Sequence, residues 1–369
     1  MNFTFSEEQE ELRRTIRRFV DEKSPSAEVR RLMETSEGYD EGVWKQMAGE
    51  LGLQGLAIPE EYGGQGFTFV ELGIVLEEMG RALLCAPFFS TVCLAANAIL
   101  FAGTDSQKAE WLPGIANGQT IATLALAEPG GGWSEASVAT QAVADGEGFR
   151  LTGSKSLVVD GHIAQLILVA ARDGDGVGLF AVQGDADGST RTQQKPLDHT
   201  RKLASLELVE VKGVRLGGAS WPEISKILDR VAVCLSAESV GGAQRCLDMA
   251  VDYAKNRYQF GRPIGSFQAI KHKCADMLLE VESAKTAAYY AMWTAAEDDP
   301  ELRLAAPSAK AYCGEAYFHT ASENIQVHGG IGFTWEHDAH LYYRRAKSSE
   351  LLFGDANYHR DLLADRLGI

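Results

Sequence analysis

No stretch of the sequence approaches the roughly 20 consecutive apolar residues that a membrane-spanning helix requires, so we predict no such helix. The opening residues, MNFTFSEEQEELRR, are acidic and then amphipathic, which is not the pattern of a secretory signal peptide. The six cysteines are scattered and form no CxxC pair or Cys/His cluster, which favours buried thiols in a reducing compartment. We therefore expect a cytoplasmic protein.

Positive charge is scarce as well, with 35 lysines and arginines against 51 aspartates and glutamates and a formal net charge of −16. Nucleic-acid binding needs a concentrated basic surface, so this balance argues against a nucleic-acid partner. It does not exclude an anionic small ligand, because a few local arginines can outweigh the global charge. The length of 369 residues, with 45% apolar and 23% charged residues, predicts a globular protein of two or three domains.

Both ends of the chain have helical patterns. Ser6 and Gln9 form a capping-box pattern ahead of a first amphipathic helix. Apolar periodicity predicts further helices over 43–53, 70–84, 90–101, 224–258, 266–296 and 301–327, with two shorter ones after them.

The middle of the chain, from 120 to 214, has a different pattern. Short β-rich runs such as TIATLALAE and AQLILVAAR are bounded by Gly and Asp and spaced like consecutive antiparallel strands. No helical segments separate them, which argues against a doubly wound nucleotide-binding fold. We therefore predict an α+β fold with an N-terminal α-helical domain (1–119), a middle antiparallel β domain (120–222) and a C-terminal α-helical bundle domain (223–369).

Two segments of the C-terminal half carry the strongest motifs. The first, YAKNRYQFGRPIGSFQAIKHKCADM, joins two predicted helices through a basic loop that can bring a guanidinium and backbone amides near a phosphate. An arbitrary loop of this kind is more often a helix corner with solvated arginines. The second, QVHGGIGFTWEHDAHLYYRRAKSSELLFG, has a GGxG that permits close approach of another chain or a cofactor, but a GGxG alone also fits a helix C-cap.

Together these segments resemble the acyl-CoA dehydrogenase family. The likeness lies in RxxFG-x(6)-Q at Arg257, Phe260, Gly261 and Gln268, and in QxxGGxG at Gln326, Gly329, Gly330 and Gly332. It extends over essentially the whole chain, including LALAEPGGG at 124–132. The resemblance implies a C-terminal four-helix bundle, FAD as cofactor, α,β-dehydrogenation of an acyl-CoA thioester, and electron transfer to an electron-transfer flavoprotein.

In that family each flavin lies across a subunit interface, and the two motifs hold the ADP half of a neighbour's FAD. The resemblance therefore assigns cofactor binding to Arg257, Phe260, Gln268, Gln326, Gly329 and Gly330, and it places Leu126 and Ala127 beside the flavin ring. The part of the site that contacts the flavin ring, called the ring half below, departs from the family pattern. Ala127 stands where the family has a Thr, and Leu157 and Val159 stand where it has Trp and Thr, so apolar groups replace ring stacking and a hydrogen bond.

The catalytic base departs from the family as well. Removal of the α-proton of a thioester needs a positioned carboxylate. The family carries a Glu either before the Gly of a late helix–helix loop or early in the long central helix. Phe353 and Val231 occupy these positions here, and neither can accept a proton.

Three acidic residues are candidates for the catalytic base or for substrate binding. Glu238 lies seven residues after Val231 on nearly the same helix face, and its largely apolar surroundings would raise its pKa, although a hydrogen-bonded structural Glu is the commoner case. Asp355 follows Gly354 but fits a helix N-cap better than a base. Asp229 resembles an aspartate that contacts the pantetheine arm in relatives, and a plain helix-entry acid is an equal alternative.

Three hypotheses follow for the function. The first is a subunit of a heteromeric enzyme, such as a heterotetramer, in which a sister chain supplies the ring contacts and the base; such enzymes occur in bacterial steroid side-chain degradation. The second is a self-sufficient homo-oligomer with Glu238 as base, and the third is a scaffold without flavin. We favour the first, because the substitutions at Ala127, Leu157, Val159 and Phe353 all fall in the ring-and-base half. We expect no metal, since His328 and the nearby His337, Asp338 and His340 supply too few converging ligands.

Overall fold

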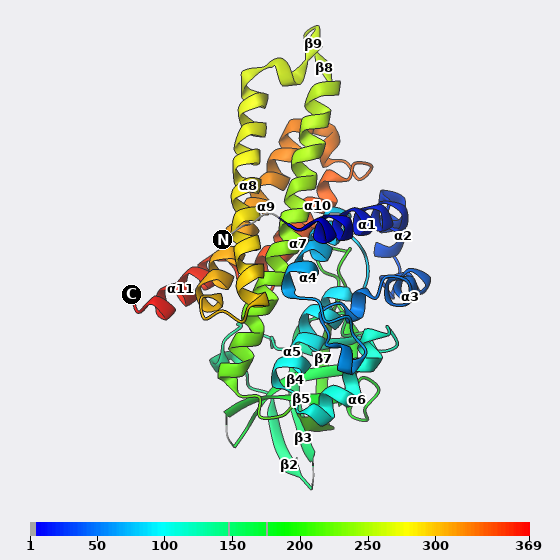
Figure 1. Ribbon diagram of the computed structural model, residues 1–369, viewed down its shortest axis with the longest axis vertical. Helices are drawn as coiled ribbons and strands as arrows, with labels where there is room; N and C mark the ends of the chain where they lie inside the picture. The colour runs from blue at the N-terminus through cyan, green and yellow to red at the C-terminus, as the bar shows by residue number, and fades with distance from the viewer. Residues whose placement is uncertain (1–4, 147, 175) are drawn as a thin grey trace. The chain divides into compact units, whose positions relative to one another are not determined.

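The computed structural model describes residues 5–146, 148–174 and 176–369, which divide into two compact units (Figure 1). The helical unit comprises Met1–Arg31, Phe69–Leu84 and Ala232–Ile369, and the mixed unit comprises Leu32–Thr68 and Cys85–Val231. No helix in the described part of the chain is both long and apolar enough to cross a bilayer. The predicted α+β fold is confirmed.

The C-terminal part of the helical unit is the predicted four-helix bundle. Its helices are α7 (Trp221–Asn256), which begins in the mixed unit, α8 (Gln268–Ala296), α9 (Leu302–His328) and α10 (Ala339–Leu351), with α11 (Ala356–Leu367) after them. Helix α9 packs against α8, α10 and α11 (Figure 1). The apolar periodicity located the three long helices to within three residues of their observed ends.

The N-terminal helices of this unit are α1 (Glu7–Lys23), α2 (Ser26–Met33), which extends into the mixed unit, and α4 (Phe69–Arg81). The predicted capping box is present at α1, because the Ser6 hydroxyl accepts from the Gln9 amide and the Gln9 side chain accepts from the Ser6 amide. Helix α2 was not predicted.

Helices α4 and α7 cross with their backbones in contact. A Cβ at Gly241 would lie 1.8 Å from the carbonyl oxygen of Glu77, and one at Gly80 would lie 2.1 Å from the carbonyl oxygen of Glu238. Only glycine permits this approach, since any side chain would overlap the facing backbone. The crossing therefore fixes where Glu238 lies in the bundle.

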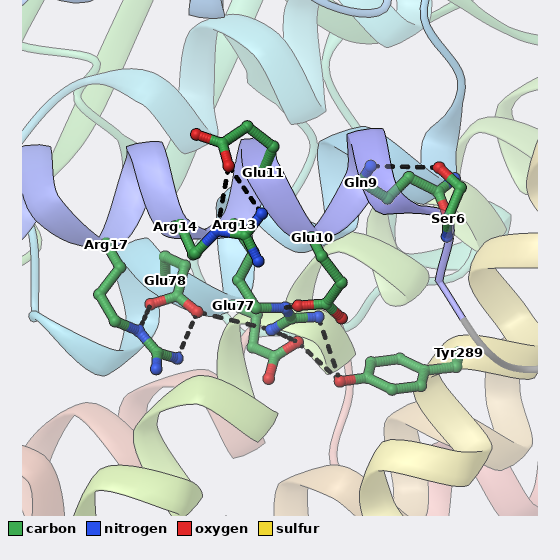
Figure 2. A network of polar contacts seen from close by, with 10 residues as sticks. All are labelled: Ser6, Gln9, Glu10, Glu11, Arg13, Arg14, Arg17, Glu77, Glu78 and Tyr289. Carbon is green, nitrogen blue, oxygen red and sulfur yellow. Dashed lines mark hydrogen bonds and ion pairs between the residues drawn. The ribbon is translucent and has the colours of Figure 1, made fainter.

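Helix α1 is attached to α4 and α8 mainly through charges (Figure 2). Glu77 and Glu78 of α4 are buried, and Arg13 of α1 contacts their carboxylates at 2.9 and 3.5 Å. Arg17 adds two hydrogen bonds to Glu78, at 2.7 and 2.8 Å. The Tyr289 hydroxyl of α8 donates to Glu77 at 2.9 Å, so three helices meet in one ionic network.

The mixed unit begins with short helices. They are α3 (Glu41–Gly49), the 3-10 turns Leu53–Gly55 and Glu60–Tyr62, the π-helical segment η3 (Phe89–Ala96), α5 (Asn97–Ala102) and α6 (Asp105–Ala116). The helix expected over 43–53 ends early because Gly52 adopts a left-handed conformation, with φ 63°. The helix expected over 90–101 is a π-helical segment followed by α5.

A seven-stranded sheet completes the mixed unit. Its strands are β1 (Ala122–Ala125), β2 (Gln141–Asp145), β3 (Gly148–Val159), β4 (Leu166–Asp173), β5 (Gly176–Gln183), β6 (Ser189–Gln193) and β7 (Leu203–Arg215). The pairings β4–β2–β3–β7–β5–β4 close on themselves around an apolar core, and β1 and β6 are attached to this ring. Most pairs are antiparallel as predicted, but β1 pairs in parallel with β4, so the strands do not all follow the expected consecutive order.

Candidate functional site

The first motif forms the tip between α7 and α8 (Figure 1). Strands β8 (Tyr258–Gln259) and β9 (Arg262–Pro263) make a tight hairpin around Phe260 and Gly261, whose φ angles are 54° and 77°. Two positive φ angles at the centre of a two-residue loop are typical of a type I′ turn. The turn presents Phe260 with 90% of its surface exposed, so this aromatic ring has almost no packing role in the helical unit.

Arg257 and Gln268 flank this hairpin. Arg257 directly follows α7, and its backbone accepts from the amide of Ile264 at 2.8 Å. Gln268 is the first residue of α8. Both side chains are exposed, so the guanidinium and the amide are accessible to a ligand or another chain.

The second motif lies at the end of α9. Gln326 is exposed, and Gly329 ends the helix with φ 63° and ψ −142°, a conformation open essentially to glycine alone. Gly330 has no such constraint, and a Cβ there would meet nothing within 4 Å among the described residues. The fold of this unit therefore explains Gly329 but gives no reason for Gly330, as expected where an outside group approaches the backbone.

The two motifs lie at the same end of the bundle. The ring of Tyr253, near the end of α7, stacks on His328 at the end of α9 with centroids 4.3 Å apart. Lys273 of α8 forms an ion pair with Glu323 of α9 close to this point. The structure thus places at the same end of the bundle the six residues that the resemblance assigns to the ADP half: Arg257, Phe260, Gln268, Gln326, Gly329 and Gly330.

The four positions of the ring half lie in the mixed unit. Leu126 and Ala127 directly follow β1 and are buried, and so is Val159 at the end of β3. Leu157 has 40% of its surface exposed and a positive φ of 53°. None of these side chains can stack as an aromatic ring or donate a hydrogen bond to a flavin.

A buried ion pair lies beside this strand end, and the sequence did not reveal it. Lys155 of β3 is fully buried, and its ammonium donates to the Glu128 carboxylate at 2.7 Å and to the Leu126 carbonyl at 3.2 Å. Burial lowers the pKa of Lys155 to about 8, with Glu128 opposing that shift. Lys155 stands between Ser154 and Ser156 on a strand that also carries Arg150, so no local pattern indicated the pair.

The loop around Phe353, where the resemblance places a catalytic base, is tightly fixed. Phe353 is buried and has a positive φ of 58°, and its carbonyl accepts from the ring Nε2 of His359 at 3.1 Å. The buried ammonium of Lys310 donates to the carbonyls of Glu350 and Gly354, each at 3.0 Å. Burial lowers the pKa of Lys310 to about 8. The loop therefore keeps a defined backbone while carrying no carboxylate at Phe353.

Glu238 has an ionic partner that the sequence pattern did not predict. Its carboxylate accepts from Arg345 of α10 at 2.9 Å, and only 7% of the residue is exposed. The predicted burial is therefore observed. A buried guanidinium partner gives this carboxylate a structural task, because an unpaired charge at this depth would cost several kcal/mol.

The other acidic candidates occupy different settings. Asp355 is the N-cap of α11, and its side chain accepts from the Tyr358 amide at 2.8 Å. Asp229 is buried eight residues after the first residue of α7, so the alternative of a helix-entry acid was wrong. Its assignment to the substrate arm stays a prediction.

The histidines near the second motif have packing and capping contacts. His328 donates to the Asn324 carbonyl at 2.8 Å and lies against the ring of His337. Asp338 forms an ion pair with Arg30 at 2.7 Å. Within the described ranges, no three or more His, Cys, Asp and Glu side chains are grouped so as to hold a metal ion.

Comparison with known families identifies the class of protein that this fold and these motifs define. The models of the acyl-CoA dehydrogenase N-terminal, middle and C-terminal domains match residues 6–119, 123–211 and 220–368. The chain belongs to the acyl-CoA dehydrogenase family, whose members are oxidoreductases.

Individual relatives and solved structures are similar to this chain over nearly its whole length. The chain is 34% identical over 349 residues to acyl-CoA dehydrogenase IpdE2 of Mycolicibacterium smegmatis, covering 95% of both chains. It is also similar to the solved structure of the steroid ACAD Tcur3481-Tcur3483, with TM-score 0.91, 32% identity and 98% of both chains covered. The ChsE4-ChsE5 complex from Mycobacterium tuberculosis gives TM-score 0.92 and 29% identity, covering 100% of this chain and 99% of that one.

Proposed function

We propose that this chain is a subunit of a heteromeric, FAD-dependent acyl-CoA dehydrogenase with the flavin at the subunit interface. The observation that carries the proposal is the contrast between the two halves of the site. The motif end of the bundle keeps an exposed Phe260 and a Gly330 that its own packing does not require. The ring half offers only the apolar side chains of Ala127, Leu157 and Val159.

The residues of the motif end fit the ADP half of FAD. The guanidinium of Arg257 can pair with a phosphate, and Phe260 offers an aromatic face beside it. Gly330 leaves its backbone open to close approach, and the side-chain amides of Gln268 and Gln326 add hydrogen-bonding groups. We infer that these groups hold a flavin whose ring lies on the sister subunit.

Bound FAD would supply the acceptor for the β-hydride of the acyl-CoA substrate, and an electron-transfer flavoprotein would then receive the electrons. The α-proton needs a carboxylate, and this chain has Phe353 and Val231 where its family carries one. The sister subunit therefore provides the base. Two of the similar structures are named as a steroid ACAD and as a two-protein complex, which favours a steroid-linked acyl-CoA and a related partner chain.

The test begins with the chain alone. We expect it to purify without the yellow flavin absorbance, and to gain that absorbance when it is co-expressed with a related acyl-CoA dehydrogenase subunit. The complex should then oxidise members of an acyl-CoA panel with an artificial electron acceptor. A yellow and active homo-oligomer would refute the heteromeric assignment, and a complex without flavin would leave only the scaffold hypothesis.

A self-sufficient enzyme with Glu238 as base is the second candidate, and it is favoured by one observation, the deep burial of that carboxylate. Its ion pair with Arg345 opposes a base role, because the guanidinium stabilises the anion and weakens its pull on a proton. Glu238→Gln decides between the two roles. Turnover falling by about 100-fold or more, with folding intact, indicates the base, whereas unchanged turnover removes Glu238 from that role.

A further inference from the structure

Helix α9 carries a row of polar side chains into the interior of the helical unit. Tyr317, Thr320 and Asn324 are each at most 1% exposed. Their spacing of three and four residues places them on one face of the helix. Within the described ranges, no group bonds with normal geometry to either hydroxyl or to either polar atom of the Asn324 side chain. Four polar atoms of this face, called the α9 polar row below, are therefore buried without a protein partner.

The surface opposite the α9 polar row belongs to α7 and α10. Gly242 of α7 lies directly against Tyr317, because a Cβ there would overlap the phenol ring and its hydroxyl. Cys246, Arg345 and Tyr342 are close enough to act electrostatically on this hydroxyl. Burial raises the pKa of Tyr317 well above its ordinary value, so the hydroxyl keeps its proton and can donate a hydrogen bond.

The polar row needs a ligand that is itself polar and uncharged. The nearest charges compensate each other, since Arg345 donates to Glu238 at 2.9 Å. Leaving a buried donor or acceptor unbonded costs stability, and folded proteins satisfy nearly all such groups with protein atoms or ordered water. Two hydroxyls and one amide can both donate and accept, which is what a buried water molecule requires of its site.

A cavity of about 240 Å³ lies next to the polar row. Arg245, Tyr342 and the exposed Asp21 are among the residues that line it. Tyr342 is buried, and its hydroxyl donates to the Arg81 carbonyl at 2.7 Å. The same side chain acts on the Tyr317 hydroxyl, so Tyr342 borders both the cavity and the polar row. Water in the cavity is thus one side chain away from the buried groups.

We propose that the α9 polar row is an internal water-binding site of the helical unit. Water molecules bound there bridge the two hydroxyls and the Asn324 amide, and they enter from the cavity beside Tyr342. Water-mediated bonds then take the place of direct ones where α9 faces α7. The site takes no part in holding flavin, so it is independent of the function proposed above.

The experiment uses the full-length chain in the assembly in which it purifies. We expect a high-resolution crystal structure to show ordered water bonded to at least two of the Tyr317, Thr320 and Asn324 side chains. Magnetic relaxation dispersion of isotope-labelled water counts the long-lived internal waters in solution. This second measurement needs no crystal and reports bound water directly.

Two variants test which groups hold the water. Tyr317→Phe and Thr320→Val each remove one hydroxyl with little change of volume. If water is bound, each variant takes away one of its partners, so the count of internal waters should fall and Tm should fall by about 2–4 °C. If the hydroxyls are dry, the same changes remove a buried unsatisfied group and should raise Tm. The sign of the Tm shift therefore distinguishes a hydrated row from a dry one.

Thr294→Val is the matched control. Thr294 is fully buried in α8, and its hydroxyl donates to the Ala291 carbonyl of its own helix at 2.9 Å. We expect this variant to lower Tm, since it loses a direct hydrogen bond, while leaving the count of internal waters unchanged.

Each outcome decides the proposal. Water at the polar row that is lost in Tyr317→Phe and Thr320→Val but kept in Thr294→Val confirms the site. A wild-type crystal structure without water there, an unchanged count in both variants, or a higher Tm in either of them overturns it. If a variant does not fold, the wild-type crystal structure still gives the answer.

Discussion

His359 shows how burial sets the charge of a single residue in this chain. Burial, aided by the nearby Lys310, lowers its pKa from 6.5 to about 3. The folded protein thus binds this proton less readily than the unfolded chain does. The contribution of neutral His359 to stability is therefore complete above about pH 6.5 and is lost as the pH falls toward 3.

We expect His359→Gln to remove this part of the acid sensitivity. One pH unit within the window corresponds to about 1.4 kcal/mol, so wild-type stability should fall by about 2 kcal/mol more than that of the variant between pH 7 and pH 5. Urea unfolding at the two pH values measures the difference. Equal slopes for His359→Gln and wild type would contradict the prediction.

The residues around Glu238 predict its burial but not its partner. The uncharged stretch around it predicted a buried carboxylate, and the structure confirms that burial. Its partner, Arg345, lies 107 positions further along the chain, and nothing in the local pattern indicates the pairing. Side-chain burial follows from local composition, whereas the partner depends on how α7 and α10 pack.

At the scale of elements, α1 depends on the ionic network of Figure 2. Only Ile16 and Val20 of this helix are buried, so its apolar contribution is small. Its buried polar attachment comes from Arg13 and Arg17, which neutralise the buried Glu77 and Glu78.

We expect Arg13→Met to destabilise the protein by about 3 kcal/mol, because it leaves Glu77 without its cationic partner in a buried site. Arg14→Met is the matched control, one position along the same helix. Its ion pair with Glu11 is exposed, with side-chain exposures of 63% and 61%, so its loss should cost less than about 0.5 kcal/mol.

Two measurements check this prediction for α1. Urea unfolding gives the loss of stability, and limited proteolysis should cut α1 faster in Arg13→Met than in Arg14→Met. Similar losses in the two variants would mean that the buried network does not hold the helix.

Elements with strong periodicity were the ones that the sequence predicted well. The long bundle helices and the α1 capping box were found, because each rests on local patterns. The parallel pairing of β1 with β4 was missed, because these strands are more than 40 residues apart in the chain and no local signal specifies their partner. Helix α2 has only eight residues, too few for a clear period.

At the scale of the whole molecule, the proposed sharing of one flavin between two subunits is tested most directly at Arg257. In the complex with its sister subunit, Arg257→Gln should weaken FAD binding by about tenfold or more, since a charge-assisted bond to a phosphate contributes about 1.5–3 kcal/mol. Lys255→Gln removes the same charge two residues earlier and should leave FAD binding unchanged. Flavin content per complex and titration with FAD give the two values.

Two results would contradict this prediction. Equal weakening by Arg257→Gln and Lys255→Gln would indicate a general effect of charge at the end of α7. Unchanged FAD binding in Arg257→Gln would place the ADP half of the flavin elsewhere.

The sequence by itself determined the family, the α+β fold and the residue types of both halves of the site. These follow from local periodicity and from motif spacing, which a linear pattern contains. Only the tertiary structure decided that Glu238 is paired with Arg345, that Lys310 and His359 fix the loop at Phe353, and that Lys155 ties the 126–128 segment to β3. The contacts of Glu238, Lys310 and Lys155 join residues 29 to 107 positions apart in sequence. The strength of all these contacts, the local His359–Phe353 bond included, depends on burial, which arises only when the helices and strands pack.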